Sequence, residues 1–335
     1  FLFYQCDHPI LEHTDMGREP LVSVIILNYN GKHLLGVCLD SVMAQSYPGL
    51  EMIVVDNGSG DASAEFVRNN YATVKVLADG SNLGYVKAAN QGIRCSAGEF
   101  VVVLNNDTRV DPFWVERLVR AARTDHSIGI CASKQLNFFN PNIIDSAGIM
   151  LLRGGYARDR GRGEADRGQY DTAGEIFGAA GASAFYRRSM LDEIGIFDED
   201  YFAYCEEFDL CFRAQLAGWK CVFVPDALVY HMSGQTRAAR DERFLVYYVE
   251  RNRLWTLIKD YPVRLFLLHW PFLLKYEIDI LMRFVGRYEK EVFFARLDAL
   301  RLLPRMLARR AAIQRRRRIR ISRLRAYIDR ERGLS

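Results

Sequence analysis

Short apolar segments alternating with helical patterns are the feature that most constrains this chain. Four such segments, at residues 21–27, 51–55, 73–77 and 100–104, are rich in β-branched residues and almost continuously apolar. Runs of this kind are typical of strands that are buried on both faces. Each is followed by a segment with apolar residues at helical spacing. The alternation predicts an α/β fold with a mostly parallel central sheet and helices on both faces.

Polar side chains follow these predicted strands. Asn28 and Tyr29 follow the first strand, Asp56 follows the second, and Asp107 lies just past Leu104. Ligands of open α/β sheets bind at the carboxyl ends of the strands. A carboxylate there can hold a divalent cation, which can hold a diphosphate, so we expect a nucleotide-sugar site. The alternative is that Asp107 begins a turn and caps the next helix.

The alternation stops near residue 134. A segment dense in Arg, Gly and Asp at 153–170 reads as a mobile loop, and two short strands are expected on either side of Pro225. We therefore divide the chain into an N-terminal arm (1–19), a catalytic domain (20–245) and a C-terminal helical region (246–335). The catalytic domain consists of a nucleotide-binding half (20–133) and an acceptor half (134–245).

The C-terminal region is strongly basic. Residues 251–335 contain 22 Lys and Arg against 8 Asp and Glu, although the formal net charge of the whole chain is only +4. Residues 276–308 show apolar residues at helical spacing among these charges, and four consecutive arginines occupy 315–318. The segment 265–274 is apolar but is interrupted by Pro271, and it is too short to span a bilayer as a helix.

This pattern predicts amphipathic helices that lie on an anionic membrane surface. The alternatives are a helical subdomain that packs on the catalytic domain and an interface with a second subunit in a homodimer. We expect no nucleic-acid partner, because no recognised binding module accompanies the charge. The seven scattered cysteines, without a Cys-x-x-Cys pair, predict reduced thiols in a cytoplasmic protein. The chain opens on Phe1, and its first residues do not have the pattern of a signal peptide. The question whether a targeting segment precedes them is left open.

Several short motifs occur in a specific order along residues 20–253. They are Asp56-Asn-Gly-Ser59, Asn82-x-Gly84 through Asn90-x-Gly92, Leu104-Asn-Asn-Asp107, Gly178 through Arg188, Tyr204-x-Glu-Glu-x-Asp-Leu210, Gly218-Trp219 and Tyr230-His231. Their joint occurrence resembles glycosyltransferase family 2, which has the GT-A fold. The resemblance is closest to bacterial rhamnosyltransferase-like members that build cell-surface polysaccharide.

The resemblance implies a role for each matching position. Glu207 corresponds to the catalytic base, with Glu206 as the second candidate, and this Glu-Glu pair replaces the Glu-Asp pair usual in the family. Metal ligands are expected at Asp107, His231 and Asn105, where Asn105 replaces the first Asp of an Asp-x-Asp motif. The nucleotide-binding residues are expected to be Asn28, Tyr29, Asp56, Asn82, Gly84, Asn90 and Asn106. Arg187, Arg188 and the arginines of 153–162 are expected to contact the diphosphate.

The activity implied by this resemblance is an inverting, metal-assisted single displacement. A sugar would move from a nucleotide diphosphate donor to a hydroxyl of a lipid-linked or cell-surface saccharide, with Mn²⁺ or Mg²⁺ as cofactor. L-Rhamnose from dTDP-rhamnose is the first expectation for the donor, and a UDP-hexose is the second. Such an enzyme would work at the cytoplasmic face of the inner membrane. The alternatives are a catalytically silent relative that binds nucleotide sugars and a nucleotidyltransferase on a similar sheet.

Overall fold

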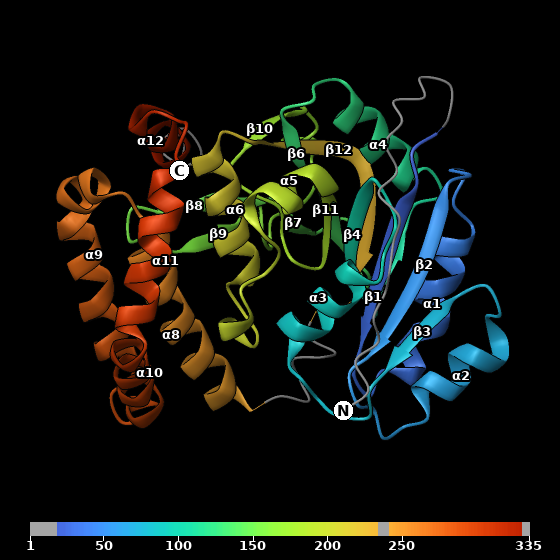
Figure 1. Ribbon diagram of the computed structural model, residues 1–335, viewed down its shortest axis with the longest axis horizontal. Helices are drawn as coiled ribbons and strands as arrows, with labels where there is room; N and C mark the ends of the chain where they lie inside the picture. The colour runs from blue at the N-terminus through green and yellow to red at the C-terminus, as the bar shows by residue number, and fades with distance from the viewer. Residues whose placement is uncertain (1–18, 234–240, 330–335) are drawn as a thin grey trace.

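The computed structural model describes residues 19–233 and 241–329, and the predicted N-terminal arm lies almost entirely outside these ranges. One ten-stranded sheet runs through the molecule in the order β10-β12-β6-β11-β4-β1-β2-β3, with β5 beside β12 and β7 beside β6 (Figure 1). A separate two-stranded sheet is formed by β8 and β9. Helices cover the central sheet, so the predicted α/β class is confirmed.

The N-terminal half contains the four predicted strands in parallel. These are β1 (Val22–Asn28), β2 (Leu50–Asp56), β3 (Lys75–Ala78) and β4 (Phe100–Asn105). The register pairs Leu27 with Asn105 and Asn28 with Asp56, so β4, β1 and β2 end side by side. The intervening helices are α1 (Lys32–Met43), α2 (Ser63–Asn70), α3 (Tyr85–Arg94) and α4 (Trp114–Arg123).

The two faces of β1 belong to two different hydrophobic clusters. Val22, Val24 and Ile26 pack with residues of α1 and α4 on one face, whereas Ile25 and Leu27 belong to the cluster on the other face. This alternation is the two-residue period of a strand, and all five side chains are buried. A strand that is covered on both faces therefore reads as one continuous apolar run in the sequence.

The C-terminal half of the sheet is mixed. It consists of β5 (Thr108–Val110), β6 (Ile128–Asn137), β7 (Ile144–Ser146), β10 (Gly174–Ile176), β11 (Ser183–Arg187) and β12 (Lys220–His231). β11 runs antiparallel to both β4 and β6. The two strands predicted around Pro225 form the single strand β12, whose pairing with β6 shifts register between Val224 and Leu228. Such an irregularity lets a strand contain a proline.

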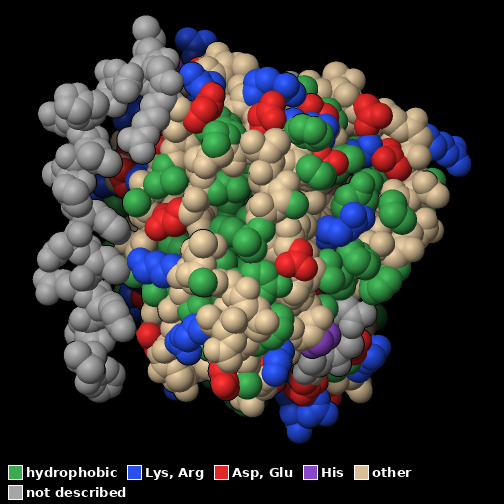
Figure 2. All heavy atoms as spheres, turned by 90° about the vertical axis from the view of Figure 1, so that its right-hand side faces the viewer, with side chains coloured by type: hydrophobic (Ala, Val, Ile, Leu, Met, Phe, Trp, Pro, Cys, Tyr) green, Lys and Arg blue, Asp and Glu red, His purple; other side chains and the backbone are tan. Residues whose placement is uncertain are grey.

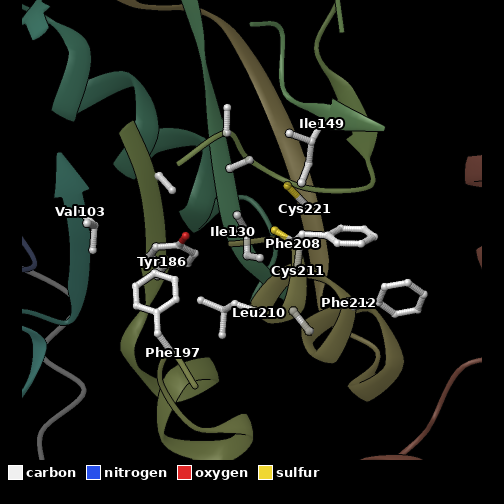
Figure 3. Close-up of a cluster of buried hydrophobic side chains, with 14 of the residues drawn as sticks. Val103, Ile130, Ile149, Tyr186, Phe197, Phe208, Leu210, Cys211, Phe212 and Cys221 are labelled. Carbon is white, nitrogen blue, oxygen red and sulfur yellow. The ribbon is translucent and has the colours of Figure 1, made fainter. Parts of the chain in front are cut away.

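The segment predicted as a mobile loop has defined structure. β8 (Ile149–Leu151) and β9 (Ala157–Asp159) pair with each other, and Tyr170 is buried. The remaining elements of this half are α5 (Arg188–Ile194), the 3-10 helix η1 (Glu199–Tyr201) and α6 (Glu206–Ala217). Figure 3 shows apolar side chains of α6 facing Ile130 and Tyr186 of the sheet. This packing fixes α6 over the sheet.

The C-terminal helices stand together at the side opposite α1 and α2 (Figure 1). They are α8 (Glu242–Asp260), α9 (Val263–Phe284), α10 (Glu289–Arg301), α11 (Leu303–Arg315) and α12 (Ile321–Asp329). α8 packs against α6, α10 and α11, so it joins this region to the catalytic domain. The predicted boundary between residues 245 and 246 falls inside α8.

Pro271 does not interrupt the helix as the sequence suggested, because α9 continues through it. A proline within a helix removes one backbone hydrogen bond, and Pro271 lies on the exposed side of α9, where water can reach the carbonyl that loses its partner. Among the described helices, none combines the length and apolar character needed to cross a membrane. Figure 2 shows the face on the α2 side of the molecule, where apolar and charged side chains are interspersed.

Candidate active site

One pocket of about 590 Å³ lies at the carboxyl ends of β1 and β4. Its volume is in the range of cavities that hold small organic ligands. Ten of the fourteen residues predicted from the sequence line it: Asn28, Tyr29, Asn82, Gly84, Asn105, Asn106, Asp107, Glu206, Glu207 and His231. They come from both halves of the catalytic domain, so the fold brings together residues that are up to about 200 positions apart in the chain.

A chain of side-chain hydrogen bonds connects the ends of β4, β1 and β2. Asn106 Nδ2 donates to Asn28 Oδ1 at 2.6 Å, and Asn28 Nδ2 donates to Asp56 Oδ2 at 2.9 Å. Asp56 Oδ1 accepts from the backbone N–H of Ser59 at 3.0 Å. Asp56 is only 5% exposed and does not line the pocket. It therefore lies behind Asn28 and orients the amide that faces the ligand space.

A second set of amides shapes the neighbouring loop. Asn57 Nδ2 donates to Asn82 Oδ1 at 3.1 Å, and the backbone N–H of Gly84 donates to the same oxygen at 2.9 Å. Gly84 has a φ of +85°, and a Cβ at this position would lie 2.5 Å from the ring of Phe202. Only glycine allows this backbone shape and this close contact. The loop after β3 is thereby fixed against the acceptor half.

Asp107 and His231 meet because β5 pairs with the end of β12, where His231 lies opposite Thr108. His231 Nε2 is 3.3 Å from Asp107 Oδ1, and His231 Nδ1 is 2.7 Å from Asp145 Oδ2. Ser233 Oγ donates to Asp145 Oδ1 at 2.6 Å. Asp145 reaches this position because β7 pairs with β6, which is also the neighbour of β12. The imidazole is therefore held on one side and faces Asp107 on the other.

These contacts change the acidity of the groups. Burial lowers the pKa of His231, but hydrogen bonds to Asp107 and Asp145 outweigh it and raise the pKa to about 9. Burial raises the pKa of Asp145, but the hydrogen bonds from His231 and Ser233 outweigh it, and the net shift is downward. The imidazolium lies between two carboxylates, so the three groups together carry one net negative charge.

The donor set fits a divalent cation that is also held by a substrate diphosphate. Asp107 offers a carboxylate oxygen and His231 an imidazole nitrogen whose ring is oriented by Asp145, as is common around protein-bound metals. Within residues 19–233 and 241–329, no group of three or more His, Cys, Asp or Glu is arranged as a complete metal site. Mg²⁺ and Mn²⁺ commonly take one or two protein ligands and complete their shell with phosphate oxygens and water.

Glu206 and Glu207 begin α6, and both line the same pocket. Glu206 is buried, whereas Glu207 is partly exposed to the ligand space. Burial, with a smaller repulsion from Asp159, raises the pKa of Glu207 from 4.5 to about 7. The charged neighbour that raises it is Asp159. A carboxyl group that titrates near neutrality can accept a proton from a hydroxyl at physiological pH.

Arg187 and Arg188 lie at the other end of the sheet, and this contradicts their predicted contact with the diphosphate. β11 is antiparallel to β4, so Arg187 pairs with Phe100 at the start of β4, whereas the pocket lies at its end. Arg187 donates to the backbone carbonyls of Ile128 and Ala122. Arg188 donates to the carbonyl of Gly98 at 2.6 Å. Both arginines connect the backbone of neighbouring elements.

Asn90 is also absent from the pocket. It is completely buried in α3, where its amide exchanges two hydrogen bonds with the backbone of Phe197. These contacts fix α3 to the segment that precedes η1. The predicted role of Asn90 in nucleotide binding therefore does not match its position.

The sequence reasoning missed several residues that line the pocket. Among them are the charged residues Asp145, Asp159 and Asp241 and the aromatic residues Tyr85, Phe202 and Phe244. Arg162 also lines the pocket, and it belongs to the arginine-rich segment that was expected near the diphosphate. It donates to Asp159 at 2.8 Å. No spacing in the sequence marks Asp145, because its place depends on the pairing of β7 with β6.

A family model described as glycosyl transferase family 2 matches residues 23–195, which is just over half of the chain. The chain belongs to glycosyltransferase family 2. The resemblance seen in the sequence is therefore confirmed, and the chain is a glycosyltransferase by family. The matched region includes the ends of β1, β2 and β4 but not α6 or His231.

Individual relatives extend the likeness further along the chain. An N-acetylglucosaminyl-diphospho-decaprenol L-rhamnosyltransferase of Mycobacterium tuberculosis is 27% identical over 266 residues, which cover 70% of this chain and 86% of that protein. An uncharacterised protein of Sinorhizobium fredii is 28% identical over 246 residues, which cover 68% of this chain. That match covers 26% of the Sinorhizobium protein, so this chain spans about a quarter of its length.

A solved structure shows the same architecture. The mannosyltransferase of Pyrobaculum calidifontis, in complex with GDP-Man and Mn²⁺, superposes with a TM-score of 0.50 at 19% sequence identity. The superposition covers 89% of this chain and 75% of that chain. The predicted GT-A fold is confirmed.

Proposed function

We propose that this member of family 2 is an inverting glycosyltransferase that moves a sugar from a nucleotide diphosphate donor to a hydroxyl of a saccharide acceptor. The observation that supports it best is the set of residues that line the pocket of about 590 Å³. Amides at the ends of β1 and β4, the pair of Asp107 and His231, and Glu207 at the start of α6 all line it. A donor with its diphosphate near Asp107 would present its anomeric carbon toward Glu207.

The residues of the pocket then have separate tasks. Asn28, oriented by Asp56, and the loop of Asn82 and Gly84 bind the nucleotide. Glu207 accepts the proton of the acceptor hydroxyl, which attacks the anomeric carbon as the bond to the diphosphate breaks. One displacement inverts the configuration at that carbon. Asp107 and His231 would hold Mn²⁺ or Mg²⁺, which when bound neutralises charge on the leaving diphosphate.

The donor and the acceptor are proposed by likeness. The Mycobacterium tuberculosis relative is by name an L-rhamnosyltransferase acting on a diphospho-decaprenol acceptor, so dTDP-rhamnose and a lipid-linked saccharide are the first candidates. A UDP-hexose is the second donor candidate. A thermal-shift screen of nucleotide sugars with Mn²⁺ identifies the donor, and its hydrolysis by the purified protein tests catalysis. Donor binding without hydrolysis or transfer would instead support the silent-relative alternative.

We further propose that the C-terminal helices bind an anionic membrane surface. The feature that supports this proposal is a set of apolar side chains that no described part of the chain covers. They are Ile278, Leu281 and Met282 of α9, Val285 directly after it, and Phe293, Phe294, Leu297 and Leu300 of α10. The same part of the chain carries exposed basic residues: Arg264, Lys275, Arg283, Arg287, Lys290 and Arg301. Apolar insertion together with basic residues is typical of interfacial helices.

Sedimentation with phosphatidylglycerol-containing vesicles tests this surface. We expect salt-sensitive binding that falls when Met282, which is 73% exposed, is replaced in Met282→Ser. Met43→Ser is the matched control, because Met43 is 52% exposed on α1 at the other side of the molecule. Absence of vesicle binding together with a concentration-dependent dimer would assign this face to a second subunit.

A further inference from the structure

A single buried amide of α8 holds the backbone that leads to the proposed base. Asn252 is 0% exposed, and its Nδ2 lies 2.9 Å from the carbonyl oxygen of Tyr201. The same Nδ2 lies 2.8 Å from the carbonyl oxygens of Ala203 and Tyr204. Three carbonyls of one short segment thus converge on two amide hydrogens.

The orientation of this amide is fixed by its neighbour. Arg251 donates from Nη2 and Nε to Asn252 Oδ1 at 2.8 and 3.0 Å, so the oxygen faces the guanidinium and the nitrogen faces the carbonyls. Arg251 Nη2 also donates to the carbonyls of Asp200 and Tyr201. The guanidinium lies 4.0 Å from the centre of the Trp255 ring. A flipped Asn252 amide would place an oxygen against three oxygens.

The segment that receives these hydrogen bonds has an unfavourable backbone. Phe202, Tyr204 and Cys205 have φ values of +63°, +68° and +64°, and none of them is glycine. Each such residue costs about 1–2 kcal/mol. Three of them within four positions need external contacts to persist. The hydrogen bonds of Asn252 are contacts of this kind, and they come from outside the nucleotide-binding half.

The same segment builds one wall of the pocket. Phe202 and Tyr204 both line it, and Cys205 is the N-cap of α6, directly before Glu206 and Glu207. The carbonyl of Phe202 also accepts from the backbone N–H of Val86 at 3.1 Å. A change in this segment would therefore move the proposed base and the aromatic wall together.

We propose that Asn252 is a positioning residue for catalysis: it holds the strained segment 201–205 so that Glu207 and the rings of Phe202 and Tyr204 face the acceptor. The inference rests on the proposed function and extends it, because it makes α8 of the C-terminal region part of the active site. Asn252 touches neither substrate nor reacting atoms in this scheme. It acts through the segment alone.

Two substitutions test the role. Asn252→Ala removes the amide. Asn252→Asp keeps the volume of the side chain but places an acceptor against three carbonyls. The aspartate variant tests the positioning role if the alanine variant does not fold. The matched control is Gln215→Ala. Gln215 is also buried, and its Nε2 donates to the carbonyls of Ile176 and Phe177 at the other end of α6.

The assay is turnover of dTDP-rhamnose or UDP-glucose with Mn²⁺, whichever the wild type hydrolyses, measured from pH 5 to pH 9. We expect both Asn252 variants to lose about 100-fold in kcat, because a displacement of the base by about 1 Å has effects of this size. The donor KM should stay within about threefold of wild type, and the midpoint of the kcat–pH profile should shift. Gln215→Ala should keep kcat and the midpoint while its Tm falls.

The possible results separate the two proposals. A wild type that turns over no nucleotide sugar contradicts the proposed function itself. An active wild type whose folded Asn252 variants match Gln215→Ala in kcat and in pH midpoint leaves the function in place and overturns the positioning role. A loss that appears only in donor KM also overturns it, since the segment would then serve donor binding.

Discussion

Replacing Glu207 by Gln should abolish activity and stabilise the protein at alkaline pH. The variant keeps the shape of the side chain and cannot accept a proton. Loss of a general base lowers kcat by about 100-fold or more. The wild type should show kcat that increases about tenfold per pH unit below a midpoint near pH 7, because only the carboxylate form of Glu207 is active and its pKa is raised to about 7.

The stability effect follows from the same raised pKa. The pKa of Glu207 is about 7 in the folded protein against an ordinary 4.5. A raised pKa means that folding favours the protonated form of Glu207. The contribution of this group to the free energy of unfolding is therefore complete below about pH 4.5 and is lost as the pH rises through 7. Each pKa unit corresponds to about 1.4 kcal/mol, so the pKa shift of Glu207 changes the free energy of unfolding by about 3 kcal/mol at most. This value is an upper limit because one edge of the carboxyl group faces the pocket, where water screens its charge.

Urea unfolding of both proteins at pH 4, 6 and 8 measures this difference. The free energy of unfolding of Glu207→Gln, relative to wild type, should rise by about 2–3 kcal/mol between pH 4 and pH 8. Glu206→Gln is the comparison, because the adjacent carboxyl group is the other candidate base. Stability curves that stay parallel over this range, or near-normal turnover by Glu207→Gln with donor binding intact, would refute the assignment.

Three further predictions concern other parts of the structure. Gly84→Ala should lower the free energy of unfolding by about 2–4 kcal/mol, because the new Cβ would lie 2.5 Å from the ring of Phe202. Gly80→Ala is the control: its φ is +74° but the space around it is open, so it should cost about 1 kcal/mol. Thermal melts of both variants measure the difference. Arg187→Leu should lower Tm and leave the donor KM unchanged, and a raised KM would restore its predicted phosphate contact. Asp107→Asn should raise the Mn²⁺ concentration for half-maximal activity at least about tenfold; activity that resists EDTA in wild type would contradict a metal role.

The nucleotide-binding half could be predicted closely because its signals are local. Each strand is a continuous apolar run, and parallel neighbours in register place Asn28, Asp56 and Asn105 at one edge without any further information. The same logic failed for Arg187. An antiparallel strand inserted beside β4 reverses which end of a segment faces the ligand, and nothing in the apolar pattern of residues 183–187 distinguishes the two directions.

The acceptor half was harder to predict because its residues meet through long-range pairing. Asp145 is recognisable only after β7, β6 and β12 are known to be neighbours. Phe202 lies at a φ that a sequence reader would expect only of glycine, so no turn signal marks it. The state of the cysteines could be predicted from their spacing alone. The six in the described residues are free thiols, whereas Cys6 lies outside these residues.

The division between catalytic domain and C-terminal region also needs a different basis than composition. The basic composition begins near Arg251, but Asn252 and Lys259 of the same helix contact the segment before α6 and the buried Asp209 within α6. Arg309 of α11 forms ion pairs with Asp198 and Asp200 of that segment. If α9 and α10 bind a membrane, α8 and α11 link that surface to the wall that holds Glu207. The helices that hold the protein near a lipid-linked acceptor would then also shape the site that receives it.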